Sequence, residues 1–297
     1  MLTEKTLIWS KGYLNDNYSK KGTETPSKEH EIIRMIETID DVIFIRNGSG
    51  YRHKYNVNDL NIFANNIHKL TKPCILITSD GDRPVPSSYN DDVCNKILNH
   101  PNIKKWYTQN YDRSIIHPKL DYYPIGFDLH TNKWLISGSI QAKINYMINC
   151  RNMSPSNKRI SNKIFSDSHH SISHPIRLEI YDMIKNNPIF ELSKHRKPFV
   201  DITEDYNKYN FALSPRGNGM DCHRTWELFL AGVIIIMKTS PLDNIFINNN
   251  LPVVILQDWD ELKSITVEKL NEWYKIHIHK TDINNIFPKL LYDYWIK

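Results

Sequence analysis

The 297-residue sequence has little of several features that would reveal its class at once. Its four cysteines, Cys74, Cys94, Cys150 and Cys222, form no CxxC pair and have no zinc-finger spacing. We therefore expect reduced, mostly buried thiols. No run of eighteen apolar residues occurs, and the N-terminus MLTEKTLIWSKGYLND lacks the apolar core of a signal peptide. These absences predict a cytoplasmic protein without a membrane anchor.

Dense basic character is also missing. Lys and Arg number 38 against 33 Asp and Glu, and no Lys/Arg run with interleaved aromatic residues occurs. Nucleic acid is therefore not an expected partner. His169 and His170 have no clear partner at metal-ligand spacing, so no zinc site is expected. The chain also lacks the GK[ST] sequence of a Walker phosphate loop.

What is present is a regular alternation of short apolar runs with amphipathic segments, the pattern of parallel sheets with helical crossovers. The length favours two domains of about 150 residues each. The pattern predicts strands over residues 41–48, 73–80, 104–110, 162–168, 211–215, 233–238 and 251–259, with an extended stretch over 121–131. It predicts helices over residues 59–70, 91–100, 174–185, 222–232, 242–246, 260–278 and 281–296.

The segment RNMSPSNKRISNK (151–163) is rich in Ser, Asn and Lys and is interpreted as an interdomain linker. It predicts domains at residues 1–150 and 151–297, the last helix packing back on the first domain. Two α/β domains of this kind bind ligands in the cleft between them, outside the carboxyl ends of the strands.

The stretch SPRGNGMDCHRTWE (214–227) joins a strand to a helix and predicts an anion site. Asp221 is a preferred N-cap residue for that helix. Gly217 and Gly219 can adopt positive φ and let the backbone approach a ligand closely. At a helix N-terminus, free N–H groups and the helix dipole favour negative charge.

Charged side chains around this turn extend the prediction. Arg216 and Arg224 can fork onto phosphate oxygens. Glu227 lies one turn later on nearly the same face as His223 and Arg224, where its carboxylate can accept hydrogen bonds from vicinal ribose hydroxyls. Arg224 and Glu227 also fit a surface ion pair worth about 0.3 kcal/mol, with the glycines as plain turn residues.

The stretch from 214 to 246, SPRGNGMDCHRTWELFLAGVIIIMKTSPLDNIF, and the following LPVVILQDWDEL (251–262) resemble the C-terminal signature of exostosin-like glycosyltransferases of the family 47 type. The likeness is strongest to the soluble forms of large viruses and algae. ILITSDGDRPVP (75–86), KWYTQN (105–110) and YPIGFDLHT (123–131) resemble the N-terminal motifs of that subgroup, so the resemblance spans about residues 40 to 262.

This resemblance implies a glycosyltransferase B fold, in which two Rossmann-like α/β domains face a cleft. The N-terminal domain would bind a glycan acceptor and the C-terminal domain a UDP-sugar. Animal and plant exostosins carry a membrane anchor, and none is expected from this sequence. The implied nucleotide-sugar contacts, together with Arg177 in the predicted helix 174–185, are Ser214, Arg216, Gly217, Asn218, Gly219, His223, Arg224 and Glu227.

Asp80-Gly81-Asp82 follows a predicted strand and has two interpretations. It resembles the DxD motif that binds a divalent metal and diphosphate in the other glycosyltransferase fold. Because a second diphosphate site would be redundant, we favour Asp80 or Asp82 as the general base of a metal-independent, inverting transfer. Asp82 also fits a plain loop-ordering role. Asp128 and His130 are alternative bases, contacts for acceptor hydroxyls or, for the histidine, a structural residue.

The sequence therefore predicts an inverting glycosyltransferase that moves a sugar from a UDP-sugar to a hydroxyl of a glycan, without a metal cofactor. The family's xylosyl-transferring members make UDP-xylose the first expectation for the donor, and glucuronic acid, galactose and arabinose stay open. Two alternatives remain. One is a metal-dependent transferase that uses Asp80-Gly81-Asp82, and the other is a non-catalytic carbohydrate- or nucleotide-binding protein of the same fold.

Overall fold

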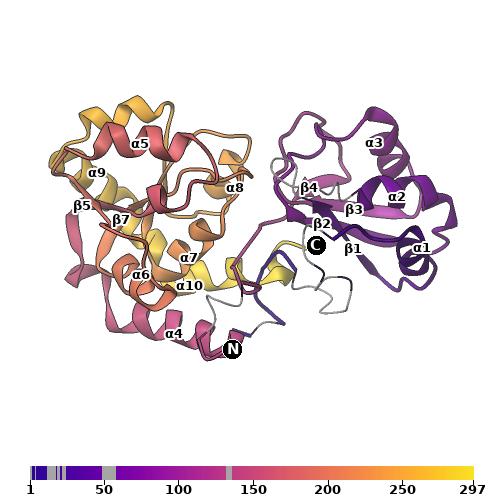
Figure 1. The fold of residues 1–297 in the computed structure, drawn as a ribbon, viewed down its shortest axis with the longest axis horizontal. Coiled ribbons are helices and arrows are strands. Elements are labelled where there is room, and N and C mark those ends of the chain that lie inside the picture. Colours follow the sequence, from indigo (N-terminus) through magenta and orange to yellow (C-terminus); the bar gives the residue numbers. More distant parts are fainter. Residues whose placement is uncertain are drawn as a thin grey trace. The chain divides into compact units, whose positions relative to one another are not determined.

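The computed structural model describes residues 2, 3, 5–11, 18, 21, 25–48, 58–131 and 136–297. The chain forms two compact units that interleave along the sequence (Figure 1). We call the first the N-terminal unit; it consists of Ile8–Ile125, Asn218–Asp221 and Trp295–Lys297. The C-terminal unit consists of Met1–Leu7, Gly126–Gly217 and Cys222–Tyr294.

The N-terminal unit is built on a four-stranded parallel sheet of order β1-β2-β3-β4. The strands are β1 (Val42–Gly48), β2 (Cys74–Gly81), β3 (Ile103–Thr108) and β4 (Leu120–Tyr122). Three helices pack in a row beside them, namely α1 (Glu29–Glu37), α2 (Asp59–Asn66) and α3 (Asp91–Leu98). Strands β1 and β2 are almost wholly buried, as expected of parallel strands.

The C-terminal unit contains a five-stranded parallel sheet of order β6-β5-β7-β8-β9. From β5 the chain moves outward to β6, and then crosses back to add the other three strands on the opposite side. The strand order therefore reverses between β5 and β7, and open α/β sheets bind ligands outside the carboxyl ends of the strands at such a point. The strands are β5 (Ile160–Ser166), β6 (Phe190–Leu192), β7 (Tyr209–Leu213), β8 (Ile234–Lys238) and β9 (Val253–Leu256).

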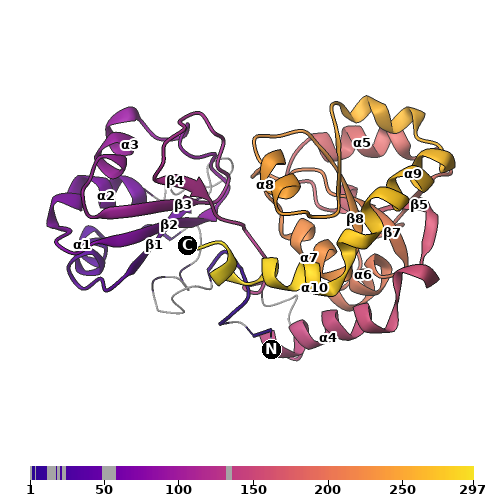
Figure 2. The same cartoon turned by 180° about the vertical axis from the view of Figure 1, so that it is seen from behind.

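Helices pack against this sheet. In the reverse view, α9 runs across β5 (Figure 2). Fully buried Ile180 of α5 and Leu270 of α9 share one apolar core with Phe211 and Ile234 of the strands. The helices of the unit are α4 (Ile140–Met153), α5 (Ile176–Ile184), α6 (Phe199–Tyr206), α7 (His223–Ala231), α8 (Asp243–Asn248), α9 (Val267–His277) and α10 (Ile283–Ile286).

The prediction of two Rossmann-like α/β domains is confirmed, since each unit has a parallel sheet with helical crossovers. Every predicted strand is present within a few residues of its expected bounds. The pattern missed β6 and the helices α1, α4 and α6. The helix predicted over 281–296 is wrong: α10 ends at Ile286, and 3-10 turns follow around Pro288. The last three residues do belong to the N-terminal unit, where the Tyr107 hydroxyl donates to the Lys297 carbonyl.

The linker predicted over 151–163 is also wrong. Helix α4 continues to Met153, and β5 begins at Ile160. Arg151 donates to the Leu230 carbonyl at 2.7 Å, and Arg159 donates to the Gly232 carbonyl at 3.3 Å. Burial lowers the pKa of both guanidinium groups to about 10. The two arginines of this polar segment therefore donate hydrogen bonds to carbonyls at the C-terminal end of α7, which have no partner within the helix. The units divide after Ile125, so residues 126–150 pack with the C-terminal unit.

Gly232 ends α7 with φ +75° in the left-handed region. We expect Gly232→Ala to lower the free energy of unfolding by more than the roughly 1–2 kcal/mol of the left-handed backbone alone. The added Cβ would lie 2.9 Å from Arg151 Nη1. Urea unfolding measures the loss. Gly138→Ala is the matched control, because Gly138 has φ +70° and open space around its Cβ position. Equal losses in the two variants would show that Arg151 moves aside freely.

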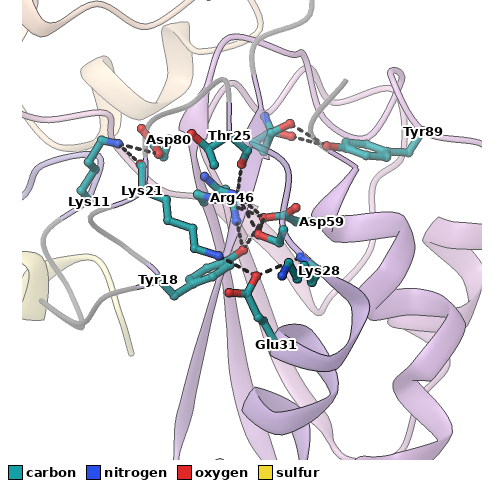
Figure 3. Close-up of polar contacts among 12 residues, drawn as sticks. Lys11, Tyr18, Lys21, Thr25, Lys28, Glu31, Arg46, Asp59, Asp80 and Tyr89 are labelled. Atoms are coloured by element: carbon teal, nitrogen blue, oxygen red, sulfur yellow. Dashed lines mark hydrogen bonds and ion pairs between the residues drawn. The ribbon is translucent and has the colours of Figure 1, made fainter. Parts of the chain in front are cut away.

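A buried ionic network ties the beginning of the N-terminal unit to its sheet (Figure 3). Arg46 of β1 forms an ion pair with Asp59 at 2.9 Å, and both side chains are fully buried. Tyr18 donates its hydroxyl proton to the same carboxylate, and Arg46 Nη2 donates to the Thr25 carbonyl at 2.7 Å. Burial, and then the Asp59 charge, hold the pKa of Tyr18 well above its usual value. The bonds from Tyr18 and Arg46 to Asp59 all use Oδ2, and the buried Oδ1 has no hydrogen-bond partner among the described residues.

Candidate nucleotide-sugar site

The switch point of the C-terminal sheet lies where β5 and β7 end. Asp167 follows the end of β5, and the loop 214–222 follows β7 and leads into α7. The hydroxyls of Ser214 and Thr225 share a buried hydrogen bond of 2.8 Å, which fixes the start of the loop against the first turn of α7. The predicted strand, glycine loop and helix therefore lie at the position where α/β sheets bind ligands.

Arg177 of α5 supports this loop through hydrogen bonds to its backbone carbonyls. Its Nε donates to the Arg216 carbonyl at 2.9 Å, and Nη2 donates to the Pro215 carbonyl at 3.3 Å. Nη1 donates to the Ser171 carbonyl at 2.7 Å. Burial, and then the Arg224 charge, lower the pKa of Arg177, which is only 4% exposed. These bonds give Arg177 a loop-supporting role, and its predicted contact with diphosphate stays a prediction.

The two glycines pack closely against neighbouring side chains. Neither Gly217 nor Gly219 has a positive φ, so that part of the prediction is wrong. A Cβ on Gly217 would lie 3.3 Å from Arg177 Nη2. A Cβ on Gly219 would lie 2.8 Å from the amide nitrogen of Asn110. Only a residue without a side chain fits at Gly219 without displacing Asn110.

The expected N-cap is also different. The N-cap of α7 is Cys222, whose side chain makes no capping bond to the helix but accepts from the Gly217 N–H at 3.0 Å. The Asp221 carboxylate instead accepts bonds from the Tyr122 hydroxyl and, at 2.8 Å, from the Ile125 N–H. Asp221 therefore anchors the chain in the N-terminal unit, and the first N–H groups of α7 are left to other partners.

Arg224 lies in the first turn of α7 and reaches the end of β5. Its Nε is 3.0 Å from a carboxylate oxygen of Asp167 and donates to the Tyr206 hydroxyl at 3.3 Å. Burial acts to lower the pKa of Arg224, but Asp167 and Tyr206 raise it above its usual value. The switch point therefore holds a permanent, oriented positive charge. Neither Asp167 nor Tyr206 was expected from the sequence.

Arg216 adds a second positive charge on the exposed part of the loop. Burial lowers the pKa of the neighbouring His174, and the Arg216 charge lowers it further. Arg216 is therefore an exposed cation next to an uncharged histidine, and its guanidinium is suited to a phosphate group.

Glu227 lies one turn beyond Arg224, yet the two do not pair. The ammonium of Lys143, a residue of α4 only 1% exposed, is 3.6 Å from Glu227 Oε1, whereas Arg224 pairs with Asp167. Burial raises the pKa of Glu227, with Lys143 the strongest opposing charge. The surface ion pair considered from the sequence is therefore wrong. Lys143 is a residue that the sequence pattern missed.

Asp128 and His130 belong to the C-terminal unit, although they were expected in the N-terminal domain. His130 Nδ1 is 3.5 Å from Asp128 Oδ1, and the His130 and His223 ring centroids are 5.5 Å apart. His223 Nδ1 bonds the Gly126 carbonyl at 2.8 Å and so carries the proton there. Burial acts to raise the pKa of Asp128, but His223, His130 and Lys143 together lower it. These groups therefore surround the start of α7.

Asp80 and Asp82 lie at the carboxyl end of β2 in the N-terminal unit. Asp80 has φ +56°, is 2% exposed and forms an ion pair with Lys11 at 3.1 Å (Figure 3). Asp82 is partly exposed and accepts a bond from Asn218 Nδ2 at 3.3 Å. A Cβ on the intervening Gly81 would lie 2.2 Å from the carbonyl oxygen of Gly48 on β1. Strand packing alone therefore requires that glycine.

Asn110 is a further residue whose role was not predicted, although it lies in the quoted motif KWYTQN. Its backbone has φ +54°, its side chain is fully buried, and Nδ2 donates to the Gly81 carbonyl at 3.0 Å. Its Oδ1 accepts from the N–H groups of Met220 and Asp221 at 2.9 and 3.0 Å. Asn110 lies two residues after the end of β3, and its side chain holds the backbone of Met220 and Asp221.

His169 and His170 both point Nε2 at the Ser193 carbonyl, at 3.0 and 2.7 Å. Across the described ranges, no group of three or more His, Cys, Asp or Glu side chains is placed to hold a metal ion. Among the helices of those ranges, none combines the length and apolar character needed to cross a bilayer.

Comparison with known proteins gives no family model and no curated protein that matches. Solved structures do match. The chain resembles the GtfA/B complex, with 11% identity over 90% of this chain and 58% of that chain and a TM-score of 0.43. It also resembles the pneumococcal O-GlcNAc transferase GtfA in complex with UDP and GlcNAc, with 10% identity, coverage of 89% and 56%, and a TM-score of 0.42.

A third match is WaaG, a glycosyltransferase involved in lipopolysaccharide biosynthesis, with 9% identity, coverage of 81% of this chain and 95% of that chain, and a TM-score of 0.32. The chain spans less than three fifths of the length of the first two proteins. With TM-scores this low, the functional assignment rests on the residues of the chain itself. The resemblance to exostosin-like enzymes stays a prediction.

Proposed function

We propose that the protein is an inverting glycosyltransferase that uses a UDP-sugar donor and a carbohydrate acceptor. One observation carries the proposal. The switch point of a parallel sheet holds a charged, oriented arginine (Arg224) and, one turn further along the same helix, a mostly buried carboxylate (Glu227). This pairing suits a nucleoside diphosphate, whose phosphates need positive charge and whose ribose hydroxyls need an acceptor.

In the proposed reaction, the acceptor hydroxyl oxygen attacks the anomeric carbon while a base takes its proton, and the bond from that carbon to the diphosphate breaks. Arg224, the exposed Arg216 and the N–H groups at the start of α7 stabilise the negative charge that develops on the leaving diphosphate. The likeness to xylosyl-transferring exostosins supports UDP-xylose as the first donor to test.

The base is proposed to be Asp82. Both carboxylates of the Asp80-Gly81-Asp82 segment were candidates, but Asp80 is 2% exposed and faces the ammonium of Lys11 at 3.1 Å. A carboxylate held by an ammonium is a poor proton acceptor, and burial keeps an acceptor hydroxyl away from it. Asp82 is partly exposed and accepts a hydrogen bond from the Asn218 amide, a neutral group.

The metal-dependent alternative would use both carboxylates to hold one cation. The Lys11 ammonium lies next to Asp80, where such a cation would have to bind. We therefore propose that fixed positive groups in the C-terminal unit serve the diphosphate instead. Chelation tests this part of the proposal, as set out in the Discussion.

The experiment that tests the function is an assay over UDP-xylose, UDP-glucuronic acid, UDP-galactose and UDP-arabinose, with calorimetry of UDP alone. UDP is expected to bind, and one donor is expected to be hydrolysed slowly without acceptor. NMR of the released sugar should show the anomer opposite to that of the donor. UDP binding without any turnover would support the non-catalytic alternative. No binding of UDP would overturn the nucleotide site.

A further inference from the structure

Lys143 is a buried lysine, and its surroundings must offset the free-energy cost of removing its charge from water. It lies in the first turn of α4, and its side chain is 1% exposed. The ammonium donates to the Asp128 carbonyl, lies 4.3 Å from the centroid of the Phe199 ring, and is 3.6 Å from Glu227 Oε1. Charged groups are rarely buried unless they are paired and hydrogen-bonded. The arrangement therefore depends on Glu227 being an anion.

Glu227 depends on Lys143 in return. Its burial favours the neutral acid, and the nearby Asp128 acts in the same direction. Arg224 is already paired with Asp167 at 3.0 Å. Lys143 is therefore the cation that lies within ion-pair distance of Glu227 in the described structure.

The charge state of Glu227 decides what it can bind. An ionised carboxylate is an acceptor on both oxygens and can accept hydrogen bonds from two adjacent hydroxyls, whereas a protonated one presents a donor and fewer acceptor sites. A ribose has vicinal hydroxyls, and a 2′-deoxyribose has lost one of them. An ionised Glu227 at a nucleotide site would therefore distinguish the two sugars.

We propose that Lys143 is a positioning residue that holds Glu227 ionised and oriented, and so sets a preference for ribonucleotides over 2′-deoxyribonucleotides. The inference rests on the proposed nucleotide-sugar site. Lys143 itself does not touch the ligand in this proposal. Its effect passes entirely through Glu227, which makes the two residues energetically coupled.

Calorimetry with UDP and 2′-deoxy-UDP on four proteins tests the proposal: wild type, Lys143→Met, Glu227→Gln and the double variant. Wild type is expected to prefer UDP by about tenfold or more, because a hydrogen bond to a charged group is lost with the deoxy ligand. Each single variant should bring the two affinities close together. The double variant should be no worse than Glu227→Gln alone. Additive losses would mean that Lys143 acts elsewhere.

The pH dependence provides a readout that a packing role would not change. The charged or titratable groups facing Glu227 are Lys143, Asp128, His223 and Arg224. Without Lys143, the pKa of Glu227 rises further, so Lys143→Met should regain the preference for UDP only as the pH increases. Wild type should keep its preference for UDP at pH values where Lys143→Met has lost it. Glu227→Gln has no carboxyl group at this position, so its pH profile is the baseline that is subtracted from the other two.

Lys143→Met leaves a buried carboxylate without its cation and can fail to fold. The double variant removes both charges, so its comparison with Glu227→Gln still decides the matter. The proposal is supported if the double variant and Glu227→Gln bind UDP equally well and also bind 2′-deoxy-UDP equally well. A further loss of UDP affinity in the double variant contradicts it. A Lys143→Met protein that keeps the wild-type preference and pH profile would also contradict it. If wild type binds UDP but shows no preference, only this inference fails; if it binds no UDP, the proposed function fails too.

Discussion

Replacing Asp82 with Asn is expected to lower the rate of sugar transfer by about 10²–10⁴-fold, the range for losing a general base. The affinity for UDP should stay close to that of wild type, because the proposed charged contacts of the nucleotide, Arg216, Arg224 and Glu227, belong to the C-terminal unit and Asp82 to the N-terminal unit. An asparagine can still accept the bond from Asn218 at this position. Transfer kinetics and UDP calorimetry on the same preparation check both parts.

Asp80→Asn is the matched control, two residues away. It leaves the buried Lys11 ammonium without its carboxylate, so thermal stability should fall. A kcat loss larger for Asp80→Asn than for Asp82→Asn, at equal stability, would return the base to Asp80. Activity of wild type in excess EDTA is expected to persist. Loss of activity with rescue by manganese, together with weaker UDP binding in both Asn variants, would establish a metal-binding DxD motif.

Arg224→Ala is expected to weaken UDP binding by about 10–100-fold, equivalent to the roughly 1.5–3 kcal/mol of hydrogen bonding by a charged group. The guanidinium is nearly buried and fixed by Asp167, so a phosphate would bind to a charge that is already oriented. Calorimetry with UDP and with uridine separates the phosphate contribution, because uridine affinity should change little.

Asp167→Asn is the control for this variant. It removes the ion pair but keeps the guanidinium, so it should lose stability as Arg224→Ala does, yet lose much less UDP affinity. Similar UDP losses in the two variants would show that the pair as a whole maintains the site. Wild-type UDP affinity in Arg224→Ala would show that Arg224 is only the structural partner of Asp167.

The sheets could be predicted from the sequence because buried parallel strands are continuous apolar runs. VIIIMK and FALSP contain β8 and most of β7 for this reason. Helix α4 was missed because its core position at Lys143 carries a charge, which breaks the apolar periodicity. The segment 151–163 was misread for the same reason. Its arginines look like solvated linker residues, but their bonds to α7 bury them.

The part of the site that lies in one local segment was predicted from the sequence. The loop and Arg224 and Glu227 lie within fourteen residues, 214–227, where spacing has meaning. The partners that give these side chains their properties lie far away along the chain. Asp167 is 57 residues from Arg224, and Asn110 is 110 residues from Met220. No spacing rule connects such residues, because the order of the strands brings them together.

The alternation of the two units along the chain has a consequence for dissecting the protein by recombinant expression. Six segments belong alternately to the two units, so the chain crosses from one to the other five times. A fragment beginning at Gly126 would lack Leu7, which is buried and bridges Leu291, and would carry Met220 and Asp221 without their acceptor on Asn110. A single cut after residue 125 therefore exposes apolar and polar groups on both products. Point substitutions in the 297-residue chain, rather than isolated halves, are the route to assigning its chemistry.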